Sequence, residues 1–172
     1  MRVLIYGFGP YRHFNVNVSE KILRLLPKHR WLKRIVFPVR FKKHQFLRAV
    51  RNACPDIVLG LGQCSGGKRL RVESMAVNQR RNASSDKPRA ILVGGPPALT
   101  TSLKFNLGSK ARPSRDAGTY VCNYSMYVIL EMIKRNRLPI RFGFVHIPYD
   151  YDARKACWAL QKAITRVRLQ YE

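Results

Sequence analysis

The sequence predicts an α/β protein, a three-layer α/β/α sandwich with helices on both faces of a mostly parallel, twisted central sheet. Short apolar segments typical of buried strands alternate along the chain with segments whose apolar residues recur at helical spacing. This alternation favours parallel strands joined by crossover helices. No internal repeat, low-complexity tract or linker divides the chain, so we expect residues 1–172 to form a single domain.

In the first half of the chain, strands are predicted where short apolar runs meet turn residues, and helices where apolar residues recur every three or four positions. Residues 7–10 contain two glycines and a proline and are predicted to close the first strand as a turn. Asn17 and Ser19 can cap the first helix, which Pro27 ends. The predicted strands are residues 2–6, 34–37 and 56–62, and the predicted helices are residues 17–26 and 42–53.

In the second half, residues 69–77 alternate in polarity, which predicts a strand with Leu70 and Val72 on one face and Glu73, Met75 and Val77 on the other. Residues 90–93 and 140–147 are further strand candidates, and residues 104–118 are predicted to be irregular. A helix is predicted to begin near residue 120, and a last helix over residues 152–169. The last helix is expected to turn five residues toward the core: Trp158, Leu160, Ala163, Ile164 and Val167.

Lysine and arginine greatly outnumber the acidic residues. The chain has 33 Lys and Arg against 9 Asp and Glu, a net charge of +24 that is spread along the whole sequence. Such a charge attracts polyanions. The sequence has no zinc-finger spacing, no ribonucleoprotein-type aromatic motif and no basic zipper. We therefore expect non-specific polyanion binding rather than sequence-specific recognition of nucleic acid.

The four cysteines, Cys54, Cys64, Cys122 and Cys157, are widely spaced. This spacing indicates neither a disulfide framework nor a zinc site, and we expect no metal and no cofactor. No apolar run approaches the length of a membrane span, and the N-terminus lacks the pattern of a secretory signal. We expect a reduced, cytoplasmic protein that does not associate with a membrane.

A polar loop changes into an apolar helix at Cys122. From Tyr120 onward the apolar residues recur at helical spacing, and the segment ends in a basic cluster before Pro139. Cys122 is therefore predicted in the first turn of a helix, beside backbone N–H groups that carry partial positive charge. Such a position favours the thiolate, which is the nucleophilic form. The alternative is a small, buried core residue.

Two further residues complete the set that a thiol hydrolase needs. His146 lies at the end of a predicted strand, where active groups of parallel sheets collect, and could accept the thiol proton and return it to the leaving amine. Glu73 could orient the imidazole and stabilise its charge. The alternatives are a core histidine in the case of His146, and a surface ion pair with Arg71 or Arg80 in the case of Glu73.

Several segments from end to end of the chain match one set of motifs. Two are specific: Ala117-Gly118-Thr119-Tyr120-Val121-Cys122-Asn123-Tyr124 and Phe144-Val145-His146-Ile147-Pro148-Tyr149. They resemble the nucleophile and histidine motifs of the pyroglutamyl peptidase I family, cysteine peptidases that remove an N-terminal pyroglutamyl residue from peptides. The other matches are weaker. Residues 2–11 resemble the family's opening strand with its G-F-x-P-F motif, and residues 17–19 resemble its N-P-[ST] motif. Residues 55–63 resemble the strand and loop that reach the substrate, and residues 72–78 resemble the segment of the catalytic glutamate.

The resemblance implies a role for each candidate residue. Cys122 would be the nucleophile, His146 the general base and acid, and Glu73 the residue that orients His146. Backbone N–H groups at the start of the helix, including that of Cys122, would stabilise the oxyanion. Gln63 would contact the pyroglutamyl ring, and aromatic walls around the ring would come from Phe8, Tyr11 and Tyr120.

The sequence departs from the family pattern at several positions. Arg12-His13 replaces the usual Gly-Gly after the first motif, and Val18 replaces the usual Pro. Ala83 occupies the register of an arginine that many members carry after the glutamate, and Arg80 and Arg81 are the nearest substitutes. The connections before the nucleophile motif and after the histidine motif are also short.

The first hypothesis is a cysteine exopeptidase that hydrolyses the amide bond after an N-terminal pyroglutamyl residue through a thioester intermediate. Its partners would be N-terminally pyroglutamylated peptides, and a homo-oligomer is compatible with it. The alternative is a catalytically weak or inactive protein of the same fold that binds polyanions or nucleic acid. A third hypothesis is a peptidase whose pocket accepts another N-terminal group.

Overall fold

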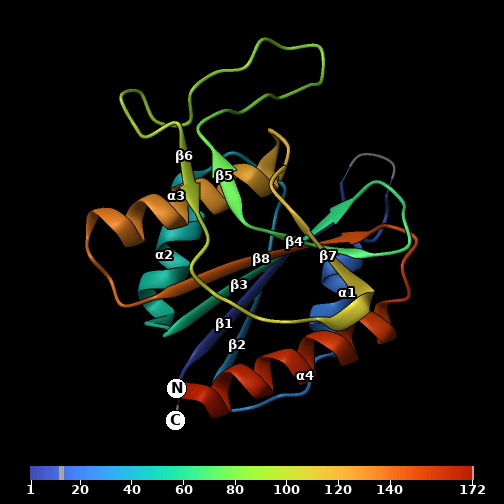
Figure 1. Ribbon diagram of the computed structural model, residues 1–172. Coiled ribbons are helices and arrows are strands. Elements are labelled where there is room, and N and C mark those ends of the chain that lie inside the picture. The colour runs from blue at the N-terminus through green and yellow to red at the C-terminus, as the bar shows by residue number, and fades with distance from the viewer. Residues whose placement is uncertain (12–13, 172) are drawn as a thin grey trace.

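The structure, a computed structural model, describes residues 1–11 and 14–171, and Arg12, His13 and Glu172 lie outside the described residues. Helices cover both faces of a six-stranded sheet (Figure 1). One face carries α1 (Val18–Leu25) and α4 (Ala153–Tyr171), and the other carries α2 (Lys43–Ala53) and α3 (Val121–Arg135). The predicted three-layer sandwich is confirmed, and the four helices lie close to the predicted ranges.

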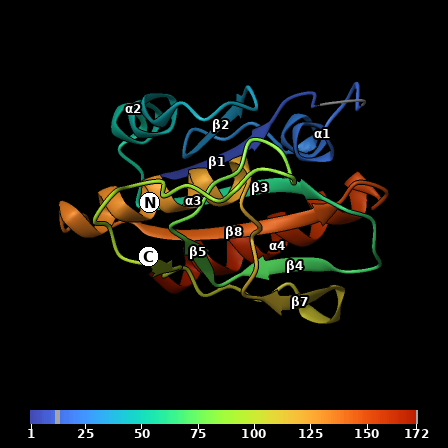
Figure 2. The same ribbon diagram turned by 90° about the horizontal axis from the view of Figure 1, so that it is seen from above.

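The strand order of the sheet is β2-β1-β3-β8-β4-β7, which Figure 2 shows from above. The first four of these strands are parallel, as predicted, whereas β4 runs antiparallel to β8 and parallel to the edge strand β7. The sequence pattern did not reveal this reversal. The strands are β1 (Val3–Phe8), β2 (Leu32–Phe37), β3 (Ile57–Cys64), β4 (Leu70–Glu73), β7 (Ala111–Ser114) and β8 (Arg141–Pro148).

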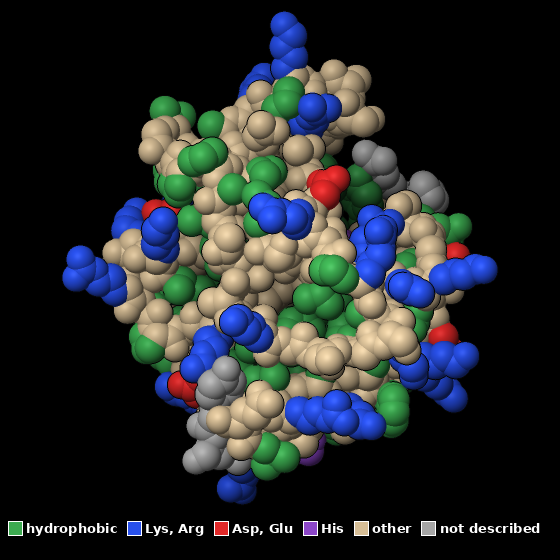
Figure 3. Space-filling view, in the orientation of Figure 1, with side chains coloured by type: hydrophobic (Ala, Val, Ile, Leu, Met, Phe, Trp, Pro, Cys, Tyr) green, Lys and Arg blue, Asp and Glu red, His purple; other side chains and the backbone are tan. Residues whose placement is uncertain are grey.

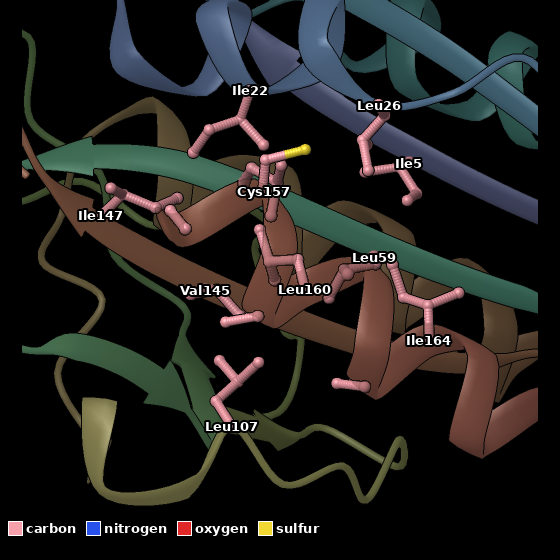
Figure 4. Packing of buried hydrophobic residues seen from close by; sticks show 14 of the residues in the cluster. Ile5, Ile22, Leu26, Leu59, Leu107, Val145, Ile147, Cys157, Leu160 and Ile164 are labelled. Atoms are coloured by element: carbon pink, nitrogen blue, oxygen red, sulfur yellow. The ribbon is translucent and has the colours of Figure 1, made fainter. Parts of the chain in front are cut away.

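Two apolar cores lie on the two faces of the sheet, because successive strand side chains point to opposite sides. On β1, for example, Val3 and Ile5 face α1 and α4, whereas Leu4 and Tyr6 face α2 and α3. Figure 4 shows the first of these cores, where strand residues meet side chains from both helices. The parallel strands are therefore buried on both faces, which explains their continuous apolar sequences.

Two strands extend beyond their predicted ends, and one predicted strand is broken. β1 continues through Phe8 and β3 through Cys64, so the turn expected at residues 7–10 begins later. The segment 69–77 is interrupted at Ser74, after which β5 (Met75–Val77) pairs with β6 (Ala98–Thr100) in a separate two-stranded sheet. The predicted alternation fails beyond this break, because Ala76 is buried and Met75 and Val77 are only half-buried.

The predicted strand at residues 90–93 is wrong. The backbone N–H groups of Ile91 and Leu92 both donate to the side-chain Oδ1 of Asn78, which holds this segment in a bend. The prediction that residues 104–118 are irregular is also wrong in part. This segment contains a short 3₁₀ helix, η1 (Gly108–Lys110), and the edge strand β7, whose Pro113 is tolerated because an edge strand can lack one ladder hydrogen bond.

The prediction for α4 holds for the core residues but fails for Trp158. The buried side includes Leu160, Ala163 and Ile164, but Trp158 is 56% exposed. Its position follows directly after the buried Cys157, so one step along the helix turns it away from the sheet. The outer side of α4 is strongly basic. None of the helices in the described part of the chain is long and apolar enough to cross a membrane.

We expect Gly60→Ala to destabilise the protein, because the middle of β3 has no room for a side chain. A Cβ at this position would lie 2.3 Å from Phe144 Cδ2 and 2.6 Å from the Tyr6 hydroxyl. Overpacking of this kind costs about 1–3 kcal/mol or more of the free energy of unfolding, which urea denaturation measures. Gly67→Ala is the matched control, since its nearest neighbour would be Pro148 Cγ at 3.8 Å. Equal stability of the two variants would contradict this description of the core.

Candidate active site

A cavity of about 350 Å³ opens at the carboxyl ends of the parallel strands. It is the position at which α/β sheets bind ligands. All four residues that the sequence analysis assigned to substrate binding line it, namely Phe8, Tyr11, Gln63 and Tyr120, and so does Cys122. The sequence analysis missed the other residues of its wall: Phe14, Asn17, Val39, Cys64, Ser65, Val121 and Tyr149.

Cys122 is the second residue of α3, as the sequence predicted. Tyr120 is the N-cap and makes no side-chain capping hydrogen bond, in contrast to Asn17, which caps α1. The first backbone N–H groups of a helix have no partner within the helix. The N–H groups of Val121, Cys122 and Asn123 are therefore available at the mouth of the cavity, together with the positive end of the helix dipole.

Cys122 and His146 lie together above Gly62 of β3. A Cβ at position 62 would be 2.6 Å from Cys122 Sγ and 3.0 Å from His146 Cδ2, so a residue without a side chain is needed here. Both side chains thus approach the same point, and the neighbouring Cys122 acts on the charge of His146. The nucleophile and the base that were proposed from the sequence are thus in contact.

Glu73 lies on the other side of the imidazole. Its Oε1 accepts a hydrogen bond of 2.8 Å from His146 Nδ1, which leaves Nε2 for Cys122. Both groups are deeply buried, with Glu73 1% and His146 5% exposed. Glu73 is therefore not the surface residue, paired with Arg71 or Arg80, that the sequence analysis considered as the alternative.

The pairing of β4 with β8 creates this contact. In the antiparallel register, Glu73 lies opposite Phe144 and Arg71 lies opposite His146. Glu73 and His146 are therefore diagonal neighbours on the same face of the sheet, and diagonal side chains of this length can touch. Since side chains alternate along a strand, a shift of one residue would place Glu73 on the other face.

The partners of His146 determine its charge. Burial by itself lowers the pKa of an imidazole, but the neighbouring Cys122 and the hydrogen bond to Glu73 outweigh it and raise the pKa of His146 from 6.5 to about 9. The imidazole is therefore protonated at neutral pH. An imidazolium beside Cys122 has a proton to donate.

Cys64 is a second thiol in the cavity wall, and its environment differs. Burial raises the pKa of Cys64 to about 11, although the charge of Arg71 acts in the opposite direction. Cys64 therefore remains a neutral thiol at neutral pH, and Cys122 is the candidate nucleophile of the cavity.

A hydrogen-bonded chain supports α3 behind the nucleophile. Ser125 Oγ donates to the backbone carbonyl of Cys122 at 2.8 Å, so the Tyr6 hydroxyl must be the donor in its 2.9 Å contact with Ser125 Oγ. Burial raises the pKa of Tyr6, which keeps its hydroxyl protonated and able to donate. The chain connects β1 to the turn that carries Cys122.

Asn123 joins α3 to the segment that follows Glu73. Its side-chain oxygen accepts from the backbone N–H of Val77, and its amide nitrogen donates to the carbonyls of Val77 and Gln79. Asn123 is completely buried, so these bonds are protected from water. Asn123 was part of the nucleophile motif, but its function as a connection between the two catalytic segments appears only in the structure.

The wall around the cavity combines aromatic rings with two oriented amides. Tyr11 and Tyr120 lie 5.1 Å apart between ring centroids. Gln63, a lining residue, accepts a hydrogen bond from the backbone N–H of Val18 at its Oε1, so its amide nitrogen remains available as a donor. Asn17 Oδ1 likewise accepts from Ser19, which leaves the Asn17 amide nitrogen as a second donor.

The guanidinium groups of the two arginines that were considered as substitutes beside the glutamate make contacts with other residues. The guanidinium of Arg80 lies over the ring of Phe41. The backbone N–H of Arg81 donates to Thr119, close to the start of α3, but its guanidinium donates to the carbonyl of Ser84. Ala83 is exposed. Among the described residues, His, Cys, Asp and Glu form no cluster that could hold a metal ion.

Known proteins share this sequence and fold. The family described as pyroglutamyl peptidase matches residues 1–156. Pyrrolidone-carboxylate peptidase 1 of Caldanaerobacter subterraneus is 32% identical, covering 87% of this chain and 83% of that protein, and the enzyme of Thermococcus onnurineus is 31% identical, covering 88% and 86%.

Two solved structures superpose closely on the chain. Pyroglutamyl peptidase I from Bacillus amyloliquefaciens is 28% identical with a TM-score of 0.84, covering 94% of this chain and 92% of that one. Pyrrolidone carboxyl peptidase from Thermococcus litoralis is 25% identical with a TM-score of 0.87, covering 99% and 94%. The agreement extends over nearly the whole length of the chain.

We expect Glu73→Gln to lower the pKa of His146. The variant removes the negative charge that favours the imidazolium, whereas burial, which favours the neutral imidazole, is unchanged. NMR titration of the imidazole measures this pKa, which is about 9 in the unaltered protein. Glu20→Gln is the matched control, since Glu20 pairs with Arg24 on α1. An unchanged His146 pKa in the Glu73 variant would contradict the assigned contact.

The same pKa predicts a pH dependence of stability. Because the pKa of folded His146 lies above its ordinary value of 6.5, protonation of His146 stabilises the fold fully below about pH 6.5 and this contribution is lost as pH rises through about 9. Denaturation across this range should show a weaker pH dependence in Glu73→Gln than in Glu20→Gln.

Proposed function

Because this chain belongs to the pyroglutamyl peptidase family, we propose that it is a cysteine exopeptidase that hydrolyses the amide bond after an N-terminal pyroglutamyl residue of peptides. The observation that carries the proposal is the contact series Glu73–His146–Cys122 at the edge of an aromatic cavity. Glu73, Cys122 and His146 are the proposed catalytic residues.

In the first step, the Cys122 thiolate attacks the carbonyl carbon of the amide bond that joins the pyroglutamyl residue to the rest of the peptide, not that of the lactam ring. The carbonyl π electrons move to the oxygen, and backbone N–H groups at the start of α3 are placed to stabilise this oxyanion. When the tetrahedral intermediate collapses, the C–N bond breaks and His146 Nε2 gives its proton to the leaving amine. The products are a pyroglutamyl thioester on Cys122 and a peptide shortened by one residue.

In the second step, neutral His146 accepts a proton from a water molecule as that water attacks the thioester carbonyl. The C–S bond then breaks, which releases pyroglutamate and restores the thiolate beside the imidazolium. Glu73 keeps its hydrogen bond to Nδ1 throughout, so the ring stays in one orientation and its positive charge is stabilised in each step.

The cavity suits a flat lactam ring. Its lining includes Phe8 and Asn17, which are almost fully buried, and the neighbouring aromatic rings of Tyr11 and Tyr120. The amide nitrogens of Gln63 and Asn17 are placed to donate to the lactam carbonyl. A residue without that carbonyl would leave both donors unpaired, and sites of this kind reject such analogues strongly.

The net charge of +24 supports a further property, which is non-specific association with polyanions. The cavity itself is not a polyanion site, because its lining contains no Lys or Arg among the described residues. Polyanion binding is therefore no alternative to hydrolysis as the function of the cavity.

We expect Cys122→Ala to lower the hydrolysis of pyroglutamyl-aminocoumarin by at least about 10³-fold, because Cys64, the other thiol among the described residues of the lining, stays protonated at neutral pH. Release of the fluorophore measures the rate. Cys54→Ala is the matched control and should retain full activity, since Cys54 is exposed at the end of α2 and bonds the carbonyl of Arg51. Activity that survives in Cys122→Ala would rule out the proposed mechanism.

We expect Gln63→Glu to lower kcat/KM for the pyroglutamyl substrate by about 10- to 1,000-fold. The variant keeps an acceptor for the Val18 N–H but presents a carboxylate oxygen to the lactam carbonyl. Gln45→Glu is the control, because Gln45 lies on α2 and bonds the carbonyl of Arg40. The ratio of kcat/KM for pyroglutamyl and prolyl aminocoumarins should fall in the first variant only, and an unchanged ratio would exclude Gln63 from recognition.

A further inference from the structure

Trp158 stands out on the surface, because large aromatic side chains are seldom left more than half exposed. The exposed positions of α4 recur three or four residues apart, which places them on one outer face of the helix. In Figure 1, α4 lies at the margin of the molecule. This outer face carries Arg154, Lys155, Trp158, Lys162, Thr165 and Arg166.

Two ammonium groups from different segments approach the exposed ring. Lys110 Nζ, at the end of η1, lies 4.8 Å from the ring centroid of Trp158, and Lys162 Nζ, one helical turn along α4, lies 5.0 Å from it. Two positive charges thus lie over the exposed indole ring.

The surface around Trp158 is hollowed and continuous. Three shallow hollows of about 170, 430 and 430 Å³ adjoin one another, since Arg166 lines all three and Trp158 and Lys162 each line two. No Asp or Glu of the described residues lines any of them. We call this region the Trp158 surface; it comprises Lys104, Asn106, Lys110, Trp158, Lys162 and Arg166.

We propose that the Trp158 surface binds single-stranded nucleic acid. An unpaired base stacks on the indole ring, and the phosphates on either side of it pair with Lys110, Lys162 and Arg166. Stacking of a base on an aromatic ring is stronger than an exposed cation–π contact, so the base displaces an ammonium group from the ring. The displaced group stays beside the phosphate of that nucleotide.

The chemistry of the surface favours this partner over other polyanions. A duplex hides the faces of its bases, and so it would use the charges but not the ring. A lipid bilayer would require a broad apolar face, whereas basic residues surround Trp158 on the outer face of α4. Stacking on the ring and pairing with phosphates do not depend on which base is bound, so the binding is expected to be largely independent of sequence.

The Trp158 surface is separate from the catalytic cavity. None of its residues lines the cavity, and α4 lies on the α1 face of the sheet, opposite to α3 and Cys122. Lys and Arg are spread over the whole face that is visible in the orientation of Figure 1 (Figure 3), so charge alone does not distinguish the surface. The exposed ring with its two lysines does.

The test uses the full chain with Trp31→Phe, because Trp31, which stacks on His29, would otherwise contribute to the fluorescence. Labelled oligothymidylate, oligouridylate and a duplex of equal length are titrated at low and at physiological salt. We expect the single strands to bind more tightly than the duplex and to quench the fluorescence of Trp158. Trp158→Ala should weaken single-strand binding by about 5- to 100-fold.

Two double charge reversals distinguish binding at the Trp158 surface from attraction by the net charge of the protein. Lys162→Glu with Arg166→Glu should reduce the slope of log affinity against log salt by about 1.4, the value for two phosphate contacts. Arg48→Glu with Arg51→Glu makes the same charge change on the exposed side of α2 and should have a smaller effect. Circular dichroism and hydrolysis of the pyroglutamyl substrate show that each variant is folded.

Three results would overturn the proposal: unchanged binding in Trp158→Ala, an equal loss from the α2 reversals, or duplex binding as tight as that of single strands. A fourth result, binding to phosphatidylserine vesicles without binding to either single-stranded oligonucleotide, would overturn it in favour of a membrane surface.

Discussion

The buried hydrogen bond between Glu73 and His146 is the constraint on which the candidate site depends. It exists because β4 joins the sheet antiparallel to β8 in one particular register. The carboxylate could not remain buried without a partner, and the imidazole would lose its raised pKa without the carboxylate and the thiol. The pairing of β4 with β8 thus sets the charge state of the imidazole beside Cys122.

The nucleophile is held to this pair from several directions. Asn123 bonds α3 to the backbone at Val77 and Gln79, and Ser125 with Tyr6 supports the carbonyl of Cys122 from the sheet. Gly62 provides the space in which the thiol and the imidazole meet. A catalytic arrangement requires such support, because a displacement of about 1 Å can cost two orders of magnitude in rate.

The two faces of the sheet serve different chemistry. On the α3 face, the cavity is mainly apolar and its polar atoms are oriented amides and the catalytic groups. On the α4 face, the outer surface is basic and carries one exposed indole ring. Since a helix presents one side to the core and the other to solvent, α4 can change its outer residues without disturbing the sheet.

The sequence by itself determined the alternation of strands and helices, the start of α3 at Cys122 and the position of His146 near the end of β8, because these follow from local periodicity and turn residues. Its motifs also singled out Glu73 and the residues Phe8, Tyr11, Gln63 and Tyr120, all of which line or adjoin the cavity. The tertiary structure alone decided the antiparallel course of β4, the break at Ser74, the bend at residues 91–92 and the exposure of Trp158. These features depend on which distant segment a strand pairs with, which side chain captures a backbone N–H, and which side of a helix meets the sheet. Local sequence carries little information on such long-range choices, because the energy that settles them comes from contacts between segments far apart in the chain.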